Sequence, residues 1–166
     1  MGKNFGWALE KSSMAFHYKT QGIILKRQDQ GEANRMFKVF CREYGKVTMF
    51  AVSERKITSK LRGGLELFSL SYLEFIQGKN KKLLVEAIPL KQYLASTQDL
   101  SCLHSAFKIA ELVDQHMAEQ EKDEKVWDLL AHSLHDLQEG SAPEKIYQSF
   151  VPEFMTLAGY GKESIV

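Results

Sequence analysis

Cysteine, proline and long apolar runs are all scarce in this sequence of 166 residues. Its two cysteines, Cys41 and Cys102, stand far apart without C-x-x-C spacing, so they indicate neither a disulfide framework nor a structural zinc site. No stretch approaches the roughly 18 apolar residues of a membrane span, and the first residues lack the apolar core of a signal peptide. We therefore expect reduced thiols, no contact with a membrane and a location in the cytoplasm.

The short motifs of common enzyme classes are also missing. The sequence contains no Walker phosphate loop, no G-x-S-x-G and no H-E-x-x-H. His132 and His135 are spaced to share a metal ion on a helix, but no second ligand pair accompanies them, and a solvated helix face explains them better. The acidic stretch 119–128 is interpreted as a solvated turn and helix start. The sequence therefore predicts no catalytic residue, no metal site and no cofactor.

Charge is divided unequally along the chain, although the formal net charge is only +1. Residues 1–93 hold 17 Lys and Arg against 8 Asp and Glu, a balance of +9, whereas residues 94–166 hold 5 against 13, a balance of −8. This asymmetry indicates two modules with different partners. The first is suited to a polyanion and the second to a basic or apolar protein surface.

The first half has the alternating apolar pattern of β-strands. Short β-branched and aromatic runs are separated by polar turns that contain glycine, and a basic connection spans residues 53–64. Pro89 is expected to end the last strand. The five strands are predicted at residues 18–26, 36–40, 47–52, 65–77 and 83–88.

After residue 93 the apolar period changes from two to about 3.6, which is typical of helices. Ser96 and Asp99 have the spacing of a capping box at the start of the first helix. Gly140 is expected to end the second helix, and Ser141 and Pro143 are expected at the N-cap and first positions of the third. The three helices are predicted within residues 96–117, 126–137 and 141–157.

These elements predict an α+β protein. Five short strands with extended loops after the first strand and before the fifth fit an OB-fold barrel, here followed by a small α-helical domain. We predict a disordered leader at residues 1–13, the OB-fold domain at residues 14–94 and the helical domain at residues 95–166. OB-folds bind single-stranded nucleic acid on the face of strands two and three and with the adjoining loops.

Cations and aromatic side chains of the first half lie where such a groove would need them. Each aromatic residue taken alone is better explained by core packing, and each cation taken alone by a solvated surface position. It is the excess of cations in one half of the chain that favours binding of nucleic acid. The basic connection at 53–64 could clamp a phosphate backbone or serve as a linker with its charges in water. The candidate stacking residues are Phe37, Phe40, Tyr44, Phe50 and Tyr72. The candidate phosphate contacts are Lys26, Arg27, Arg35, Lys38, Arg42, Lys46, Lys56, Lys60, Arg62, Lys79, Lys81 and Lys82.

Four ordered motifs resemble a known family. They are Gly22–Leu25 followed by cations, Gly31–Arg35, Arg42–Lys46 and Leu61–Glu66. At this spacing the run is similar to the N-terminal part of RecO, the recombination mediator of bacterial DNA repair. The helical half adds only a weak likeness, through its helix pattern and the LAGYG at Leu157–Gly161.

The resemblance implies a function without catalysis. RecO proteins join an N-terminal OB-fold to a helical domain, bind single- and double-stranded DNA, anneal complementary strands, cooperate with RecR and help RecA replace single-strand-binding protein. The helical domain of the family can dock the acidic tail of single-strand-binding protein. A nucleoid-associated location in the bacterial cytoplasm is also implied. The DNA contacts that carry over are Lys26, Arg27, Arg35, Arg42, Lys56, Lys60 and Arg62.

Two departures from the family pattern leave alternatives open. Many members carry a four-cysteine zinc module that this sequence lacks, and the chain stops soon after residue 161 where members usually continue. It is either a short divergent member or a truncated product. A different hypothesis is a protein-protein adaptor whose OB-like barrel binds a peptide, since such barrels host many functions.

Overall fold

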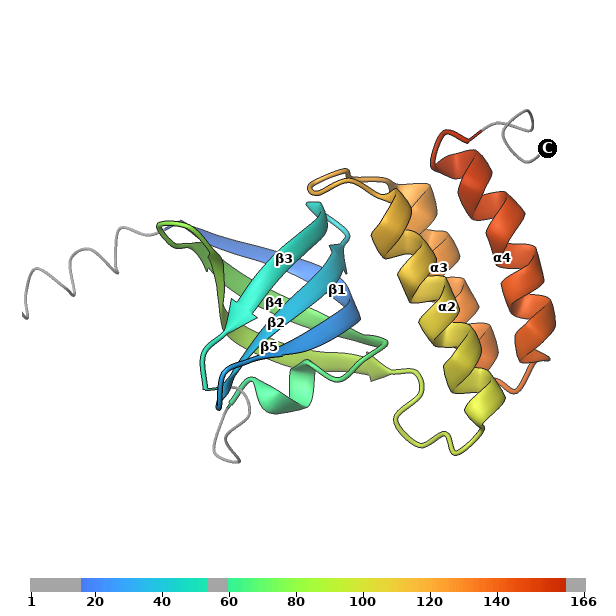
Figure 1. Cartoon of the computed structure of the whole chain (residues 1–166), viewed down its shortest axis with the longest axis horizontal. Coiled ribbons are helices and arrows are strands. Elements are labelled where there is room, and N and C mark those ends of the chain that lie inside the picture. Colours follow the sequence, from blue (N-terminus) through green and yellow to red (C-terminus); the bar gives the residue numbers. More distant parts are fainter. Residues whose placement is uncertain (1–15, 54–59, 161–166) are drawn as a thin grey trace, which may run out of the picture.

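The computed structural model describes residues 16–53 and 60–160, and places five strands before three α-helices (Figure 1). The strands form a closed barrel in the order β1, β2, β3, β5, β4. The predicted α+β class and the OB-fold barrel are confirmed. The strands are β1 His17–Gln30, β2 Asn34–Cys41, β3 Gly45–Ala51, β4 Ser69–Gln77 and β5 Lys82–Gln92. The helices are the short 3-10 helix η1 Arg62–Gly64, then α2 Leu100–His116, α3 Glu124–Gln138 and α4 Pro143–Leu157.

The long strand β1 closes the barrel because it pairs on both sides. Its first half is antiparallel to β4, from His17 opposite Ile76 to Ile23 opposite Leu70. Its second half is antiparallel to β2, with a register shift after Ile24 that lets the strand bend. A short parallel contact between β3 and β5 completes the ring.

Alternation along the strands sends one set of side chains into the barrel. Phe37, Val39, Met49 and Leu73 are fully buried there, which is the inner face that the period-two pattern predicted. Next to η1, Leu65 caps this core. The barrel interior is thus filled by side chains and is not a channel.

Three strand boundaries differ by four residues from those predicted. Strand β1 does not end at Lys26 but continues to Gln30, so the expected extended loop after the first strand is reduced to residues 31–33. Residues 65–68 do not belong to β4, because Phe68 adopts a left-handed conformation with φ of 63° that interrupts extended backbone. Strand β5 does not end at Pro89 but continues to Gln92. Proline is accommodated because β5 pairs only with β4 there, and the register shift between Leu70 and Ser71 lies opposite.

Helix caps agree with the sequence in part. Asp99 is itself the N-cap of α2 and accepts hydrogen bonds from the backbone N–H groups of residues 101 and 102, so the capping box predicted from Ser96 was wrong. Ala142, not Ser141, is the N-cap of α4, and Pro143 follows as predicted. Gly140 follows α3 with φ of 86°, as expected for a residue that ends a helix.

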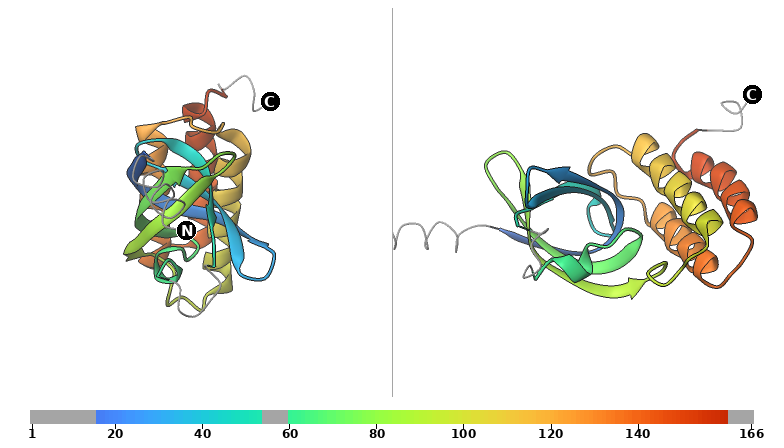
Figure 2. Two further views of the ribbon diagram at one scale, coloured as in Figure 1. Left: turned by 90° about the vertical axis from the view of Figure 1, so that its left-hand side faces the viewer. Right: turned by 60° about the horizontal axis from the view of Figure 1, so that its bottom comes forward.

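The helices pack as a small layer beside the barrel, and a view along the barrel shows all three on one side of it (Figure 2, right). Ile23, Leu25 and Phe40 on the outer face of β1 and β2 belong to the same apolar cluster as the helix interior. The ring of Phe40 stacks on Trp127 of α3 at a centroid distance of 6.5 Å. The helical half is therefore docked on the barrel through a shared core. Among the described residues, no helix has the length and apolar content needed to cross a membrane.

Candidate nucleic-acid interface

The outer side of β2 and β3 divides into a covered part and an open part. Of the five candidate stacking residues, Phe37 points into the barrel and Phe40 packs on Trp127, and both have no exposed surface. Neither can stack on a base, so these two expectations are corrected. Both side chains are part of the core, because alternation buries one face of each strand and the helices cover part of the other face.

Phe50 occupies the open part. It lies on β3 directly opposite Met36 of β2, and both side chains are half-buried. The Nζ atom of Lys81, from the loop before β5, sits 4.5 Å from the centre of the Phe50 ring. An ammonium group over an aromatic face is favourable, and the two groups together can contact a base and its phosphate.

Further cations border the same surface. Lys26 of β1 lies opposite Lys38 of β2; Lys38 is on the strand next to that of Phe50, and Lys26 is one strand further away. We call the surface formed by Lys26, Met36, Lys38, Phe50 and Lys81 the outer face. Lys26 and Lys81 are exposed, and within the described part of the chain neither forms an ion pair.

Three predicted phosphate contacts are instead paired with acidic residues of the helical half. Lys38 Nζ lies 3.1 Å from Asp114 Oδ1, and Lys46 Nζ lies 3.3 Å from the same oxygen. Lys46 also donates a hydrogen bond of 2.6 Å to the Asp114 carbonyl and is only 7% exposed. The expectation that Lys46 contacts a phosphate is therefore corrected, because it is buried between the two halves.

Arg42 is the third such residue and remains on the surface. Its Nε and terminal nitrogen both donate to one carboxylate oxygen of Glu124, at 3.1 and 2.8 Å. This hydrogen bond and the accompanying charge attraction raise the pKa of the guanidinium. A phosphate would have to compete with Glu124 for Arg42. Part of the positive charge of the first half is therefore neutralised by acidic residues of the second half.

The remaining predicted cations are dispersed over the barrel. Arg27 is 3.6 Å from Glu66, and Arg35 donates a hydrogen bond of 2.7 Å to Asp29. Exposed Lys60 and Arg62 lie in or beside the η1 segment, where Lys60 lines a depression against β5 and not the outer face. Exposed Lys79 and half-buried Lys82 flank Lys81 in the β4–β5 segment. Lys56 lies outside the described residues.

The other two candidate aromatics lie away from the outer face. Tyr72 is on β4, opposite Gln21 and Ile88, so it faces a different side of the barrel. Tyr44 is at the β2–β3 turn, where its ring stands edge-on to Tyr18 at a centroid distance of 5.7 Å. Their stacking on DNA stays a prediction, but only Phe50 lies on the outer face.

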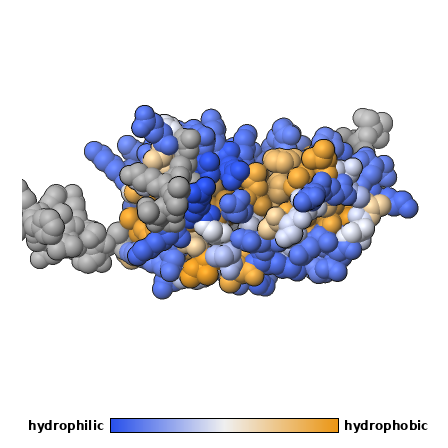
Figure 3. Space-filling view, turned by 90° about the horizontal axis from the view of Figure 1, so that it is seen from below, coloured by the Kyte–Doolittle hydropathy of each residue, from blue (hydrophilic) through white to orange (hydrophobic). Residues whose placement is uncertain are grey.

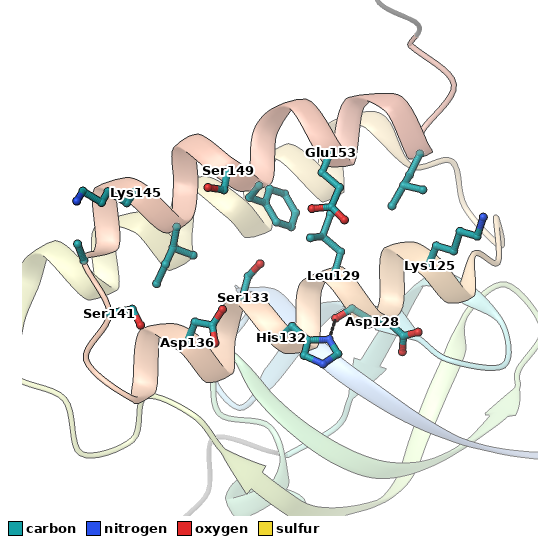
Figure 4. Close-up of a pocket in the computed structure, with 14 residues that line it drawn as sticks. Lys125, Asp128, Leu129, His132, Ser133, Asp136, Ser141, Lys145, Ser149 and Glu153 are labelled. Carbon is teal, nitrogen blue, oxygen red and sulfur yellow. Dashed lines mark hydrogen bonds between the residues drawn. The ribbon is translucent and has the colours of Figure 1, made fainter.

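The helical half contributes a groove that the sequence did not reveal. It runs between α3 and α4 and has a volume of about 640 Å³ (Figure 4). Its lining mixes apolar side chains such as Leu129 and Phe150 with acidic ones, namely Asp128, Asp136 and Glu153. Lys125 and Lys145 lie toward its opposite ends. Such a groove requires two helices to be placed relative to each other, and helix periodicity alone does not give that placement.

Apolar surface also remains on α2. Leu100 is 79% exposed and Phe107 is 50% exposed, although Phe107 makes an edge-to-face contact of 5.0 Å with Phe68. Seen from below, hydrophobic surface gathers over the helical half of the molecule (Figure 3).

His132 and His135 make separate contacts. His132 donates from Nδ1 to the Asp128 carbonyl at 2.7 Å, while His135 is 2.9 Å from Lys91 Nζ. No group of three potential metal ligands occurs among residues 16–53 and 60–160. Burial raises the pKa of the Cys41 thiol, which keeps it in its unreactive neutral form.

Comparison with known proteins decides the family. The family model described as Recombination protein O N terminal matches residues 14–93, and the one described as Recombination protein O C terminal matches residues 97–163. The chain belongs to the RecO family. This confirms the resemblance carried by the four N-terminal motifs and extends it to the helical half.

Several RecO relatives are similar over most of the chain. The DNA repair protein RecO of Roseiflexus sp. (strain RS-1) is 29% identical over 143 residues, which cover 86% of this chain and 50% of that protein. The DNA repair protein RecO of Gloeothece citriformis (strain PCC 7424) is 31% identical over 134 residues, covering 81% and 47%. That of Dehalococcoides mccartyi (strain BAV1) is 30% identical over 146 residues, covering 88% and 58%. The chain therefore spans about half the length of the curated relatives it matches.

Proposed function

We propose that this chain binds single-stranded DNA on the outer face of its barrel, as a non-catalytic mediator of DNA repair and recombination. One observation carries the proposal. Phe50 is the single candidate stacking residue on the open part of β2 and β3. Lys81 stands over its ring and Lys26 lies two strands away on the same side of the sheet, and neither lysine has an acidic partner among the described residues. An aromatic platform bordered by cations is the arrangement with which OB-folds hold single strands.

The expected energetics follow from these groups. Stacking one base on Phe50 is worth roughly 1 to 3 kcal/mol, and each neutralised phosphate adds a contribution that weakens with salt. With about four cations engaged, the logarithm of the binding constant should fall with the logarithm of salt concentration at a slope near −3. The four best placed are Lys26, Lys79, Lys81 and Lys82. No base-specific contact is invoked, so binding is expected to tolerate any sequence.

Annealing of complementary strands and assistance to RecA are the finer parts of the proposal. They rest on membership of the RecO family and on no geometry of this chain. We include double-stranded DNA as a second ligand and RecR as a partner on the same ground. The place of action would be the bacterial nucleoid.

The groove between α3 and α4 supports a further proposed partner. Its apolar side chains and its two lysines, Lys125 and Lys145, suit an acidic peptide with apolar side chains, such as the tail of single-strand-binding protein. Asp128, Asp136 and Glu153 also line the groove, so attraction of an acidic peptide would come only from contacts with Lys125 and Lys145 themselves.

Fluorescence anisotropy of a labelled single-stranded oligonucleotide tests the proposal. Binding at low salt that weakens steeply as salt is raised supports it. Absence of binding at low salt would contradict it and would favour the adaptor hypothesis, in which the grooves bind only protein. An apolar peptide site should respond little to salt, so a labelled acidic peptide distinguishes the two functions.

A further inference from the structure

An aromatic pocket opens at one end of the barrel, and none of the residues that define the outer face lines it. It has a volume of about 340 Å³ and is lined by Tyr18 of β1, Tyr44 of the β2–β3 turn and Phe75 of β4. Lys82 of β5 and Lys122 of the α2–α3 connection contribute the cations. Pockets that hold small aromatic ligands begin at about this size.

The three rings form two perpendicular walls. Tyr18 stacks on Phe75 with a centroid distance of 5.1 Å and an interplanar angle of 15°. Tyr44 stands across this pair, at 84° to Phe75 and 87° to Tyr18. Phe75 is buried and forms the floor, while the two tyrosines are half-buried. A planar ring entering the pocket can therefore stack on one tyrosine and meet the edge of the other.

The polar groups of the pocket are available to a ligand. Within the described residues, neither tyrosine hydroxyl makes a hydrogen bond and neither lysine forms an ion pair. Glu43 is the acidic residue of the lining. The site thus combines unsatisfied hydrogen-bonding groups, an excess of positive charge and an aromatic interior.

The helical half fixes the outer wall of the pocket. The Gln120 backbone donates a hydrogen bond of 2.7 Å to the Lys46 carbonyl, and any β-carbon at Gly45 would collide with the Glu121 backbone. Thr48 Oγ1 also donates to Glu119 at 2.7 Å. The connection that carries Lys122 is therefore held against the barrel, and the pocket is formed before any ligand arrives.

We propose that this barrel-mouth pocket takes one unpaired nucleobase of bound single-stranded DNA, stacked on Tyr18 or Tyr44, with adjacent phosphates on Lys82 and Lys122. The proposal rests on the proposed DNA-binding function and gives it a specific base site. Continuity of the surface supports this occupant, because Lys81 over the Phe50 ring and Lys82 in the pocket are consecutive residues. A base in a duplex cannot enter, so the pocket would favour single strands.

Photo-crosslinking locates the base directly. An oligonucleotide carrying 5-iodouracil is bound to the full chain, irradiated and mapped by mass spectrometry. We expect crosslinks on Tyr18 or Tyr44. Replacement Y44L should weaken binding roughly 5- to 150-fold, the loss of one stacked base, whereas Y44F should stay within about twofold because it keeps the ring.

A surface variant keeps the test valid should Y44L fail to fold. Lys122→Gln alters an exposed side chain and should lower both the affinity and the crosslink yield at the tyrosines several-fold. Lys125→Gln, three residues later and lining the α3–α4 groove, is the matched control and should change neither. If the oligonucleotide binds but crosslinks map elsewhere and both Y44L and Lys122→Gln bind normally, the pocket proposal is overturned while DNA binding stands. If the oligonucleotide does not bind at all, both proposals fail.

Discussion

The ionic contact at the junction of the two halves gives the sharpest stability prediction. Asp114 of α2 holds Lys38 and Lys46 at 3.1 and 3.3 Å, and its own side chain is 12% exposed. Replacing Asp114 by Asn removes the charge and leaves Lys46, which is almost fully buried, without its carboxylate.

The expected loss follows from burial. Removing one partner of a buried ion pair costs about 3 to 5 kcal/mol. The loss should be smaller here, roughly 2 to 3 kcal/mol, because Lys46 keeps its 2.6 Å hydrogen bond to the residue 114 carbonyl and Lys38 is partly in water. Urea denaturation followed by circular dichroism measures the difference.

Two further variants make the reasoning refutable. Glu111→Gln changes an exposed acid one turn earlier on α2 and should shift stability by no more than about 0.5 kcal/mol. The double change of Asp114→Leu with Lys46→Met should recover most of the loss, because apolar replacement removes both buried charges. If Asp114→Asn costs as little as Glu111→Gln, the contact does not stabilise the docking of the two halves. Single-strand affinity should meanwhile rise in Asp114→Asn, since Lys38 is released toward the outer face.

Three other outcomes are expected. Phe50→Ala should weaken single-strand binding in anisotropy titrations by about 1 to 3 kcal/mol, whereas Leu100→Ala, at an exposed position of α2, should not. Gly64→Ala should lower the unfolding free energy by about 1 to 3 kcal/mol, because its β-carbon would lie 2.5 Å from a backbone carbonyl carbon of β5. The control Gly63→Ala should be neutral or slightly stabilising, because no atom lies within 4 Å of the added β-carbon. Burial raises the pKa of Cys41 above the ordinary thiol value of 9.0, so above pH 9 the thiol ionises in the unfolded chain and stays neutral in the folded one. The free energy of unfolding should therefore be unaffected by this thiol below that pH and should decline above it, by up to about 1.4 kcal/mol per pH unit. Cys41→Ala should make that decline shallower; an unchanged slope would refute the assignment.

Local patterns in the sequence were sufficient for the fold. Period-two alternation located all five strands, because a barrel must bury one face of each, and the change to a 3.6 period located the three helices. The errors fell where a single backbone angle or a neighbouring strand decides the outcome. Phe68 adopts positive φ that its residue type does not suggest, and Pro89 is tolerated because β5 has one partner strand there.

The candidate site was less predictable because its main determinants are long-range. Lys38 and Asp114 are 76 residues apart, and Arg42 and Glu124 are 82 apart, so no local pattern links them. The same docking buries Phe40, which the sequence alone cannot distinguish from Phe50. The composition did show that the two halves carry opposite charges. That charge difference was a signal from which ion pairs between the halves could have been predicted.

The salt dependence of single-strand binding tests the central claim most directly when it is measured on a paired set of variants. The Lys26→Gln and Lys81→Gln double variant removes two cations of the outer face, and the Lys125→Gln and Lys145→Gln double variant removes two from the α3–α4 groove. The slope of log binding constant against log salt should decrease in magnitude by about 1.4 in the first and stay unchanged in the second. Equal slopes in all three proteins would contradict binding of DNA on the outer face.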